Sequence, residues 1–285
     1  SDEPRIKKKF KSQSHSSFLI AILISLIGFL YLYSLLQNPY MEDNLFLSFI
    51  FSVLRLLVCF VFSFLIIKFL ILNKFVSKDK IIKSYFNPIK NFLNRYGNFA
   101  FLILLLISLY RIADVVMGVM ANIFYLEKGY KIIEIATYSK FFGVFATILG
   151  GLIGGFCSFK FGTMKSLFFG ALIAASSNFL FALLAISPIS IDFLIAVITA
   201  DNISSGFAGA AFVVYLSGLT SVKFTATQYA LFSSIMLFIP KLIAGYAGSW
   251  VDVMGYPYFF SLTAFLGIPV LFLIIWIGKI APIKN

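Results

Sequence analysis

Charged residues are scarce in this 285-residue chain: Asp, Glu, Lys and Arg make up 12% of it, while 61% of the residues are hydrophobic. Soluble domains carry about 25% charged and about 45–50% apolar residues, so the composition excludes a soluble globular domain. The net charge of +12 is not accompanied by the solvated basic surface that nucleic-acid binding requires. We therefore expect the basic residues to interact with a membrane, and we expect no nucleic-acid partner.

Histidine and cysteine are also nearly absent, with one His and two Cys. Cys59 and Cys157 lie within apolar runs, which favours small buried hydrophobes over a disulfide or a metal site. His15 is the lone histidine and lies in a polar tail. The chain has neither a glycine-rich phosphate loop nor a nucleophile-elbow motif. These absences predict a protein that is not an enzyme and that binds no metal or cofactor.

Long apolar runs dominate the rest of the sequence. Eight of them approach or exceed the ~20 residues that an α-helix needs to cross ~30 Å of hydrocarbon. Short breaks with turn residues separate them, such as Asn38-Pro39 and Lys160-Phe161-Gly162. The sequence therefore predicts an all-α polytopic membrane protein with eight transmembrane helices. These are expected at residues 18–37, 45–72, 98–126, 132–157, 166–186, 193–219, 229–248 and 257–277.

Lys and Arg are distributed unevenly between the two sides of these spans. Sixteen lie on the side of both termini, and only Lys128 and Lys131 lie on the other side. Because basic loops are retained in the cytoplasm, both termini are expected to be cytoplasmic. The first 37 residues also resemble a signal peptide, but their apolar run is longer than a signal peptide needs and another span follows directly.

These features predict five parts along the chain. The chain opens with Ser1, from which we expect it to be a piece of a longer protein. The parts are a basic cytoplasmic tail or linker at 1–17, a two-helix transmembrane hairpin at 18–72, a basic cytoplasmic loop at 73–97, a six-helix unit at 98–277 and a cytoplasmic tail at 278–285.

Several ionisable side chains lie well inside the predicted spans. At ~3 kcal/mol for each charge at a helix centre, five charges facing lipid would cost on the order of 15 kcal/mol. We therefore expect these side chains to face one another or water. Lys68 can extend to the membrane surface, whereas Arg55 has no evident acidic partner and stays unexplained. The five deeply placed residues are Arg111, Asp114, Lys140, Asp201 and Lys241.

Helical spacing indicates where these residues point. Arg111, Asp114, Gly118 and Asn122 recur every three or four residues, so Arg111 and Asp114 can pair on one polar face. A second stripe joins Lys140 to the overlapping GxxxG pairs Gly150/Gly154 and Gly151/Gly155, which allow another helix to approach. Two further stripes start at Asp201 and at Lys241, where Pro240 is expected to kink the helix. Such stripes favour a water-accessible pathway; buried ion pairs that only fix helix register are the alternative.

Several stretches resemble one transporter family. They include Tyr110-Arg111-Ile112-Ala113-Asp114, Ser139-Lys140-Phe141-Phe142-Gly143 and, most specifically, Phe224-Thr225-Ala226-Thr227-Gln228-Tyr229-Ala230-Leu231. Residues 98 to about 277 are similar to the carboxy-terminal half of the AmpG-type muropeptide permeases of the major facilitator superfamily. The chain departs from the family in having Asp201 in place of Glu and Pro240-Lys241 in place of Gly-Arg.

The resemblance implies a function and a location. It implies proton-coupled uptake of anhydro-muropeptides across the bacterial inner membrane for cell-wall recycling, with lipid, muropeptide and protons as partners. The six helices at 98–277 would form one half of a facilitator bundle, and the amino-terminal half would be missing. The hairpin at 18–72 matches no family motif. A facilitator for another solute, or a non-transporting remnant or assembly partner, are the alternatives.

The resemblance and the stripes together give each candidate site residue a role. Asp114 and Asp201 would bind protons. Arg111, Lys140 and Lys241 would balance these carboxylates and meet the carboxylates of the peptide stem. Asn122, Asn202 and Gln228 are candidates for hydrogen bonds to sugar or amide groups, with plain helix–helix contacts as the alternative.

Overall fold

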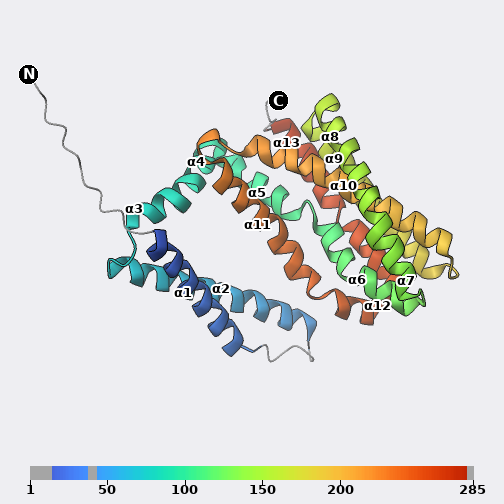
Figure 1. Ribbon diagram of the computed structural model, residues 1–285, viewed down its shortest axis with the longest axis horizontal. Helices are drawn as coiled ribbons and strands as arrows, with labels where there is room; N and C mark the ends of the chain where they lie inside the picture. The colour runs from blue at the N-terminus through green and yellow to red at the C-terminus, as the bar shows by residue number, and fades with distance from the viewer. Residues whose placement is uncertain (1–14, 38–43, 281–285) are drawn as a thin grey trace, which may run out of the picture. The chain divides into compact units, whose positions relative to one another are not determined.

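The computed structural model describes residues 15–37 and 44–280, and the regular elements within these ranges are all helices (Figure 1). Eight segments there are long and apolar enough to cross a membrane, which confirms the prediction of an all-α polytopic membrane protein. The predictions for Asn38-Pro39, most of the tail at 1–17 and most of the tail at 278–285 lie outside the described residues. The helices form two compact units, divided between Asn87 and Pro88.

Unit 1 is built around a helical hairpin. Helix α1 (His15–Leu35) packs against α2 (Leu45–Leu72), and the short α3 (Lys78–Ile81) and a π-helical turn (Ile82–Phe86) follow. Small residues line the seam on α1: Ala21 and Ser25 are buried, and a Cβ placed on Gly28 would lie 2.4 Å from Ile66 Cδ1. Close van der Waals contact of this kind holds helices together in lipid, where the hydrophobic effect does not.

Polar contacts fasten the same hairpin. Ser25 Oγ donates to the Ser63 carbonyl at 3.3 Å, and Ser63 Oγ donates to the Ser25 carbonyl at 3.2 Å. Arg55 Nε donates to the Tyr33 carbonyl at 3.0 Å, and the guanidinium lies 3.5 Å from the centre of the Tyr33 ring. Tyr33 lies in the last turn of α1, where carbonyls lack partners within the helix. Arg55 therefore caps the negative end of α1, which explains a charge that has no acidic partner.

Unit 2 contains the remaining helices. Helix α10 packs against both α8 and α9, α12 packs on α6 and α9, and α11 packs on α5 and α6 (Figure 1). Aromatic rings fill the core, for example Tyr110 stacked on Phe212 with ring centres 4.4 Å apart. The main helices are α4 (Asn87–Tyr96), α5 (Ala100–Leu109), α6 (Ile112–Lys128), α7 (Ile132–Ile135), α8 (Gly143–Phe161), α9 (Thr163–Ile186), α10 (Ile191–Leu219), α11 (Thr225–Ala244), α12 (Ala247–Phe265) and α13 (Ile268–Ile280).

Three of the expected spans contain a short break in the helix. The span at 98–126 breaks between α5 and α6, the span at 229–248 between α11 and α12, and the span at 257–277 between α12 and α13. Broken helices are tolerated within a bundle because neighbouring helices satisfy the freed backbone groups. The apolar pattern of one span carries no information about its neighbouring helices, so the breaks could not be predicted from that pattern.

The stretch at 249–256, which separates two expected spans, also differs from the expected boundaries. It is helical as far as Met254, and the chain leaves helical geometry at Gly255, where φ is 77°. The residues before Gly255 therefore form the first part of α12. The segment at 73–97 likewise contains α3, a π-helical turn and α4 between the two expected helical regions.

One of the two overlapping GxxxG pairs forms the contact between α8 and α10. A Cβ on Gly150 would lie 2.1 Å from the Ile203 carbonyl oxygen, and a Cβ on Gly154 would lie 2.5 Å from the Phe207 carbonyl oxygen. A Cβ on Gly151 would have its nearest neighbour at 3.9 Å. The backbones of α8 and α10 thus approach so closely that only glycine fits at the Gly150/Gly154 pair.

We predict that Gly150→Ala destabilises unit 2 and that Gly151→Ala does not. Both changes bring the same gain of ~1 kcal/mol in helix propensity, so their difference isolates the contact with α10. We expect Gly150→Ala to lower the free energy of unfolding by at least the ~1–3 kcal/mol of an overpacked core site. Thermal unfolding of the purified chain in mild detergent measures this; equal midpoints for the two variants would contradict the close packing.

Candidate functional site

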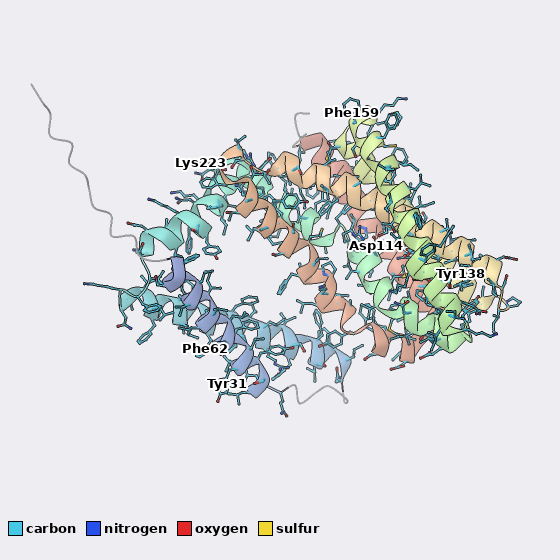
Figure 2. The ribbon with its side chains drawn as sticks, viewed as in Figure 1. Tyr31, Phe62, Asp114, Tyr138, Phe159 and Lys223 are labelled. Atoms are coloured by element: carbon cyan, nitrogen blue, oxygen red, sulfur yellow. The ribbon has the colours of Figure 1, made fainter. Side chains whose placement is uncertain are left out.

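Arg111 and Asp114 form an ion pair at the break between α5 and α6. Arg111 Nη2 lies 3.1 Å from Asp114 Oδ2, and the two side chains retain 21% and 11% of their exposure. Figure 2 shows Asp114 inside unit 2, between the levels of Phe159 and Tyr138 near the two ends of the bundle. The pair therefore lies deep between the helices and is largely shielded from solvent.

The broken helix adds to the stabilisation of the Asp114 carboxylate. Arg111 is the N-cap of α6, with φ −98° and ψ 12°, and Asp114 lies in the first turn. The first N–H groups of a helix have no acceptor within it, and this end carries a partial positive charge that favours an anion. Both the guanidinium and the helix end thus favour a negative charge at Asp114.

Arg111 also ties this break to α10. Its Nη2 donates to Ser205 Oγ at 3.0 Å, and its Nη1 donates to the Ser205 carbonyl at 3.3 Å. One turn earlier on α10, Asp201 accepts a hydrogen bond from Ser177 Oγ at 3.4 Å. Asp201 also lies within electrostatic range of Asp114 and Arg111. The two carboxylates thus share one buried region.

Residues of α9 complete this region. Asn178 is fully buried and donates from Nδ2 to the Ala113 carbonyl at 3.3 Å, next to Asp114. Sequence reasoning missed Ser177 and Asn178, although the polar triplet Ser176-Ser177-Asn178 stands out within an apolar span. We call the assembled region the carboxylate cluster; it consists of Arg111, Asp114, Ser177, Asn178, Asp201 and Ser205.

The carboxylate cluster has one cation for two carboxylates. Arg111 pairs with Asp114, and the described part of unit 2, residues 88–280, contains no second ion pair. In that part of the chain the hydrogen-bond donor to the Asp201 carboxylate is the Ser177 hydroxyl. A buried charge without a counter-charge costs several kcal/mol in a medium of low dielectric. Asp201 is therefore the group where an added positive charge would be most favourable.

The structure does not bring Lys140 and Lys241 into the carboxylate cluster. Both side chains are exposed, as is Asn122 on α6, and neither lysine forms an ion pair with another described residue. Of the five deeply placed charges, the structure thus brings Arg111, Asp114 and Asp201 together and leaves the two lysines apart from them. Lys140 lies in a π-helical segment (Ala136–Phe142), whose wider turns rotate it out of the stripe that continues in α8. Lys241 lies on α11, which packs mainly on α5 and α6.

Asn202 and Gln228 are engaged in contacts between helices. Asn202 accepts from Thr147 Oγ1 at 2.9 Å and donates to the Ile198 carbonyl at 2.8 Å, which links α10 to α8. Gln228 is fully buried; it donates to the Pro88 carbonyl at 2.8 Å and accepts from the Ser221 N–H at 2.7 Å. Of the two roles expected for these amides, the geometry favours the helix–helix contact.

These features define a class of protein. Eight apolar spans, broken helices and charges buried between helices are typical of membrane transporters. Groups of three or more His, Cys, Asp or Glu that could hold a metal do not occur in the described ranges 15–37 and 44–280. The chain is a multi-pass membrane protein of the kind to which transporters belong.

Comparison with known proteins identifies its relatives. The chain is 33% identical over 265 residues to "Putative transporter AmpG 4" of Rickettsia felis, covering 92% of this chain and 62% of that protein. It is 36% identical over 189 residues to "Putative transporter AmpG 1" of Rickettsia bellii, covering 66% of this chain and 46% of that protein. No family model matches the chain. The chain is a homologue of the AmpG transporters, which confirms the resemblance seen in the motifs; the relatives' names describe transporters and not enzymes.

The extent of these alignments adds two facts. The chain spans 62% of the length of the Rickettsia felis relative, so that relative is considerably longer. The alignment covers 92% of this chain and must therefore include most of the α1–α2 hairpin. The hairpin, which matches no family motif, is thus part of the homologous region.

We predict that Asp114→Asn lowers the stability of the fold. A second change at Arg111 should restore part of this stability, and a second change at Lys140 should not. Removing one partner of a buried pair costs ~3–5 kcal/mol because the other charge is left alone. Asp114→Asn with Arg111→Gln removes both charges and should unfold at a higher temperature in detergent than Asp114→Asn alone. Asp114→Asn with Lys140→Gln is the control and should match the single variant; recovery there would mean that Lys140, and not Arg111, is the partner.

Proposed function

We propose that the chain is part of a proton-coupled secondary transporter that imports anhydro-muropeptides across the bacterial inner membrane for cell-wall recycling. The homology to AmpG transporters supports the transporter class, and the similarity of residues 98–277 to muropeptide permeases supports the substrate. The observation that carries proton coupling is the excess carboxylate at Asp201 in the carboxylate cluster.

In this proposal Asp201 carries the proton. Binding a proton there neutralises the one carboxylate of the cluster that has no cation, so the cost of keeping it in a low-dielectric region disappears. Asp114 then keeps Arg111 in place through the 3.1 Å ion pair, while Arg111 holds Ser205 one turn from Asp201. A change in the charge of Asp201 therefore affects the contacts that join α6, α9 and α10.

The exposed polar residues of the spans are assigned to the substrate path. Lys140, Lys241 and Asn122 would each be costly against lipid, ~3 kcal/mol for a lysine at a helix centre. We infer that they face an aqueous pathway, where the two lysines attract the carboxylates of the peptide stem and Asn122 hydrogen-bonds sugar or amide groups. Because the relatives are longer than this chain, we infer that an amino-terminal part of the transporter closes this pathway.

Uptake of labelled anhydro-muropeptide tests this proposal directly. Cells that lack their own permease would express the chain alone, or the chain together with the amino-terminal part of an AmpG relative. We expect uptake only in the second case, and collapse of the proton gradient should abolish it. Uptake of a different solute would favour another facilitator function. No uptake of any solute, with or without the amino-terminal part, would favour a non-transporting partner.

We predict that Asp201→Asn abolishes concentrative uptake but leaves exchange of labelled for unlabelled substrate. A permanently neutral side chain mimics the protonated state, which can bind and exchange substrate but cannot release a proton to drive accumulation. Asp192→Asn is a matched control, because Asp192 is an exposed acid in the first turn of the same helix. Loss of both exchange and uptake in a well-folded Asp201→Asn variant would assign Asp201 to structure or substrate binding instead.

We also predict that both termini and residues 73–97 are cytoplasmic, because of the excess of basic residues on that side. In a variant without Cys59 and Cys157, Ser77→Cys should not react with an impermeant thiol reagent added outside the cell. Ile189→Cys, at the other end of the spans and 61% exposed, should react rapidly. The reverse pattern would invert the proposed orientation.

A further inference from the structure

The two ends of unit 2 differ in charge. Spans alternate in direction, so one end gathers the start of α9 and α11 with the end of α8, α10 and α13. Six basic residues lie at this end, which we call the basic end, and the acidic residues of the range 88–280 all lie elsewhere. The six residues are Lys90, Arg95, Lys160, Lys165, Lys223 and Lys279.

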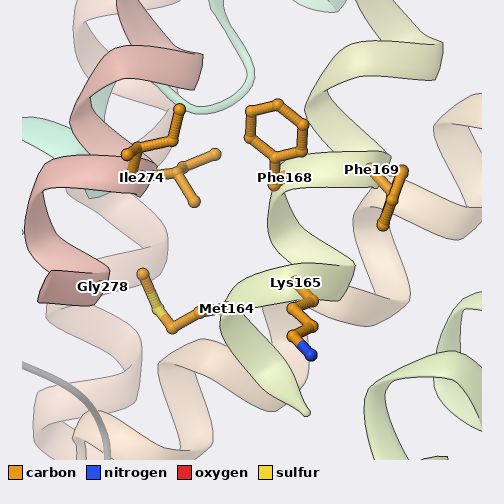
Figure 3. A pocket seen from close by; sticks show the side chains of 7 residues that line it. Met164, Lys165, Phe168, Phe169, Ile274 and Gly278 are labelled. Atoms are coloured by element: carbon orange, nitrogen blue, oxygen red, sulfur yellow. The ribbon is translucent and has the colours of Figure 1, made fainter. Parts of the chain in front are cut away.

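A shallow groove of about 220 Å³ opens at the basic end between α9 and α13. Figure 3 shows its apolar walls, with Phe168 on α9 facing Ile274 on α13; Phe169 on α9 also lines it. Lys165 lines the groove near the start of α9, on the same side as Gly278. The groove therefore combines an apolar floor with a cationic rim.

The size of the groove excludes it as the substrate pathway. Small-molecule sites usually enclose ~300–1,000 Å³ and bury most of their ligand, whereas this groove is smaller and shallow. It also lies at the ends of membrane-spanning helices and away from the carboxylate cluster, which lies at least about two helical turns deeper along α9, at Ser177 and Asn178. An occupant must reach it from the side or surface of the bundle.

We propose that this groove binds an anionic phospholipid. One acyl chain lies against Phe168, Phe169 and Ile275, and the phosphate lies at Lys165 on the rim. Lys279 follows the lining residue Gly278 directly, and neither Lys165 nor Lys279 forms an ion pair with a residue in the described ranges. Cations at the ends of membrane helices that have no acidic partner attract anionic head groups.

Charge complementarity decides between lipid classes. A zwitterionic head group carries its own cation, which six basic residues without a local acid would repel. An anionic head group has no such cation and gains from every lysine at the rim. The apolar walls in turn favour a lipid over a free phosphate, because a phosphate alone would leave Phe168 and Ile275 uncovered.

Native mass spectrometry of the full chain, released from nanodiscs of equal parts phosphatidylglycerol and phosphatidylcholine, tests the proposal. We expect the chain to retain phosphatidylglycerol in preference to phosphatidylcholine with the same acyl chains. Lys165→Gln should weaken this retention about fivefold, as expected for one lysine near an anionic surface. Lys223→Gln is the matched control, because it removes the same charge at the same end but lies outside the groove.

A second variant tests the apolar half of the site. Gly278→Leu leaves all charges in place and fills the groove, since a Cβ there already lies 3.6 Å from Met164 Cε. We expect it to reduce lipid retention as well, and glycerol phosphate without acyl chains should not bind the unchanged chain. Equal retention of the two lipids, or equal effects of Lys165→Gln and Lys223→Gln, would overturn the proposal in favour of general surface attraction.

Discussion

A polar group within hydrocarbon has no water to bind, and the arrangement of this molecule follows from that constraint. Carbonyls at the ends of helices are the most numerous such groups, and basic side chains from neighbouring segments cap them. Arg55 caps α1, Arg95 donates to carbonyls at the end of α10, and Lys128 donates to carbonyls at the end of α9 at 2.7 and 3.0 Å. Arg95 and Lys128, which a charge count assigns to the membrane surface, thus also bind the ends of helices.

The same constraint explains the carboxylate cluster. Breaking a helix in the membrane frees backbone groups, and the break between α5 and α6 places Arg111 and Asp114 next to them. Arg111 leaves helical geometry and reaches Asp114 and Ser205, while the new helix start favours the Asp114 carboxylate. Asp201 then remains as the carboxylate of the cluster without an ion pair to a described residue.

Sequence reasoning succeeded where one property along the chain decides the outcome. Hydropathy alone predicted eight spans, the spacing of three residues allowed Arg111 and Asp114 to pair, and the motifs around Tyr110 and Phe224 pointed to the right transporters. Sequence reasoning failed where a contact with a neighbouring helix, or the local shape of the helix itself, decides the outcome. Gly150 and Gly151 look alike in the sequence, yet only Gly150 touches α10, and Lys140 leaves its stripe because the helix before α8 widens into a π-helix.

The sequence by itself determined that the chain spans a membrane, how many apolar segments it has and which residues are too polar to face lipid. These follow from the transfer energies of side chains, which depend on residue type and hardly on partners. The tertiary structure decided where helices break, which glycines pack and which charges meet. Those outcomes depend on contacts of a few ångströms between helices far apart in the chain, such as Arg111 with Ser205, and no periodicity within one helix encodes them.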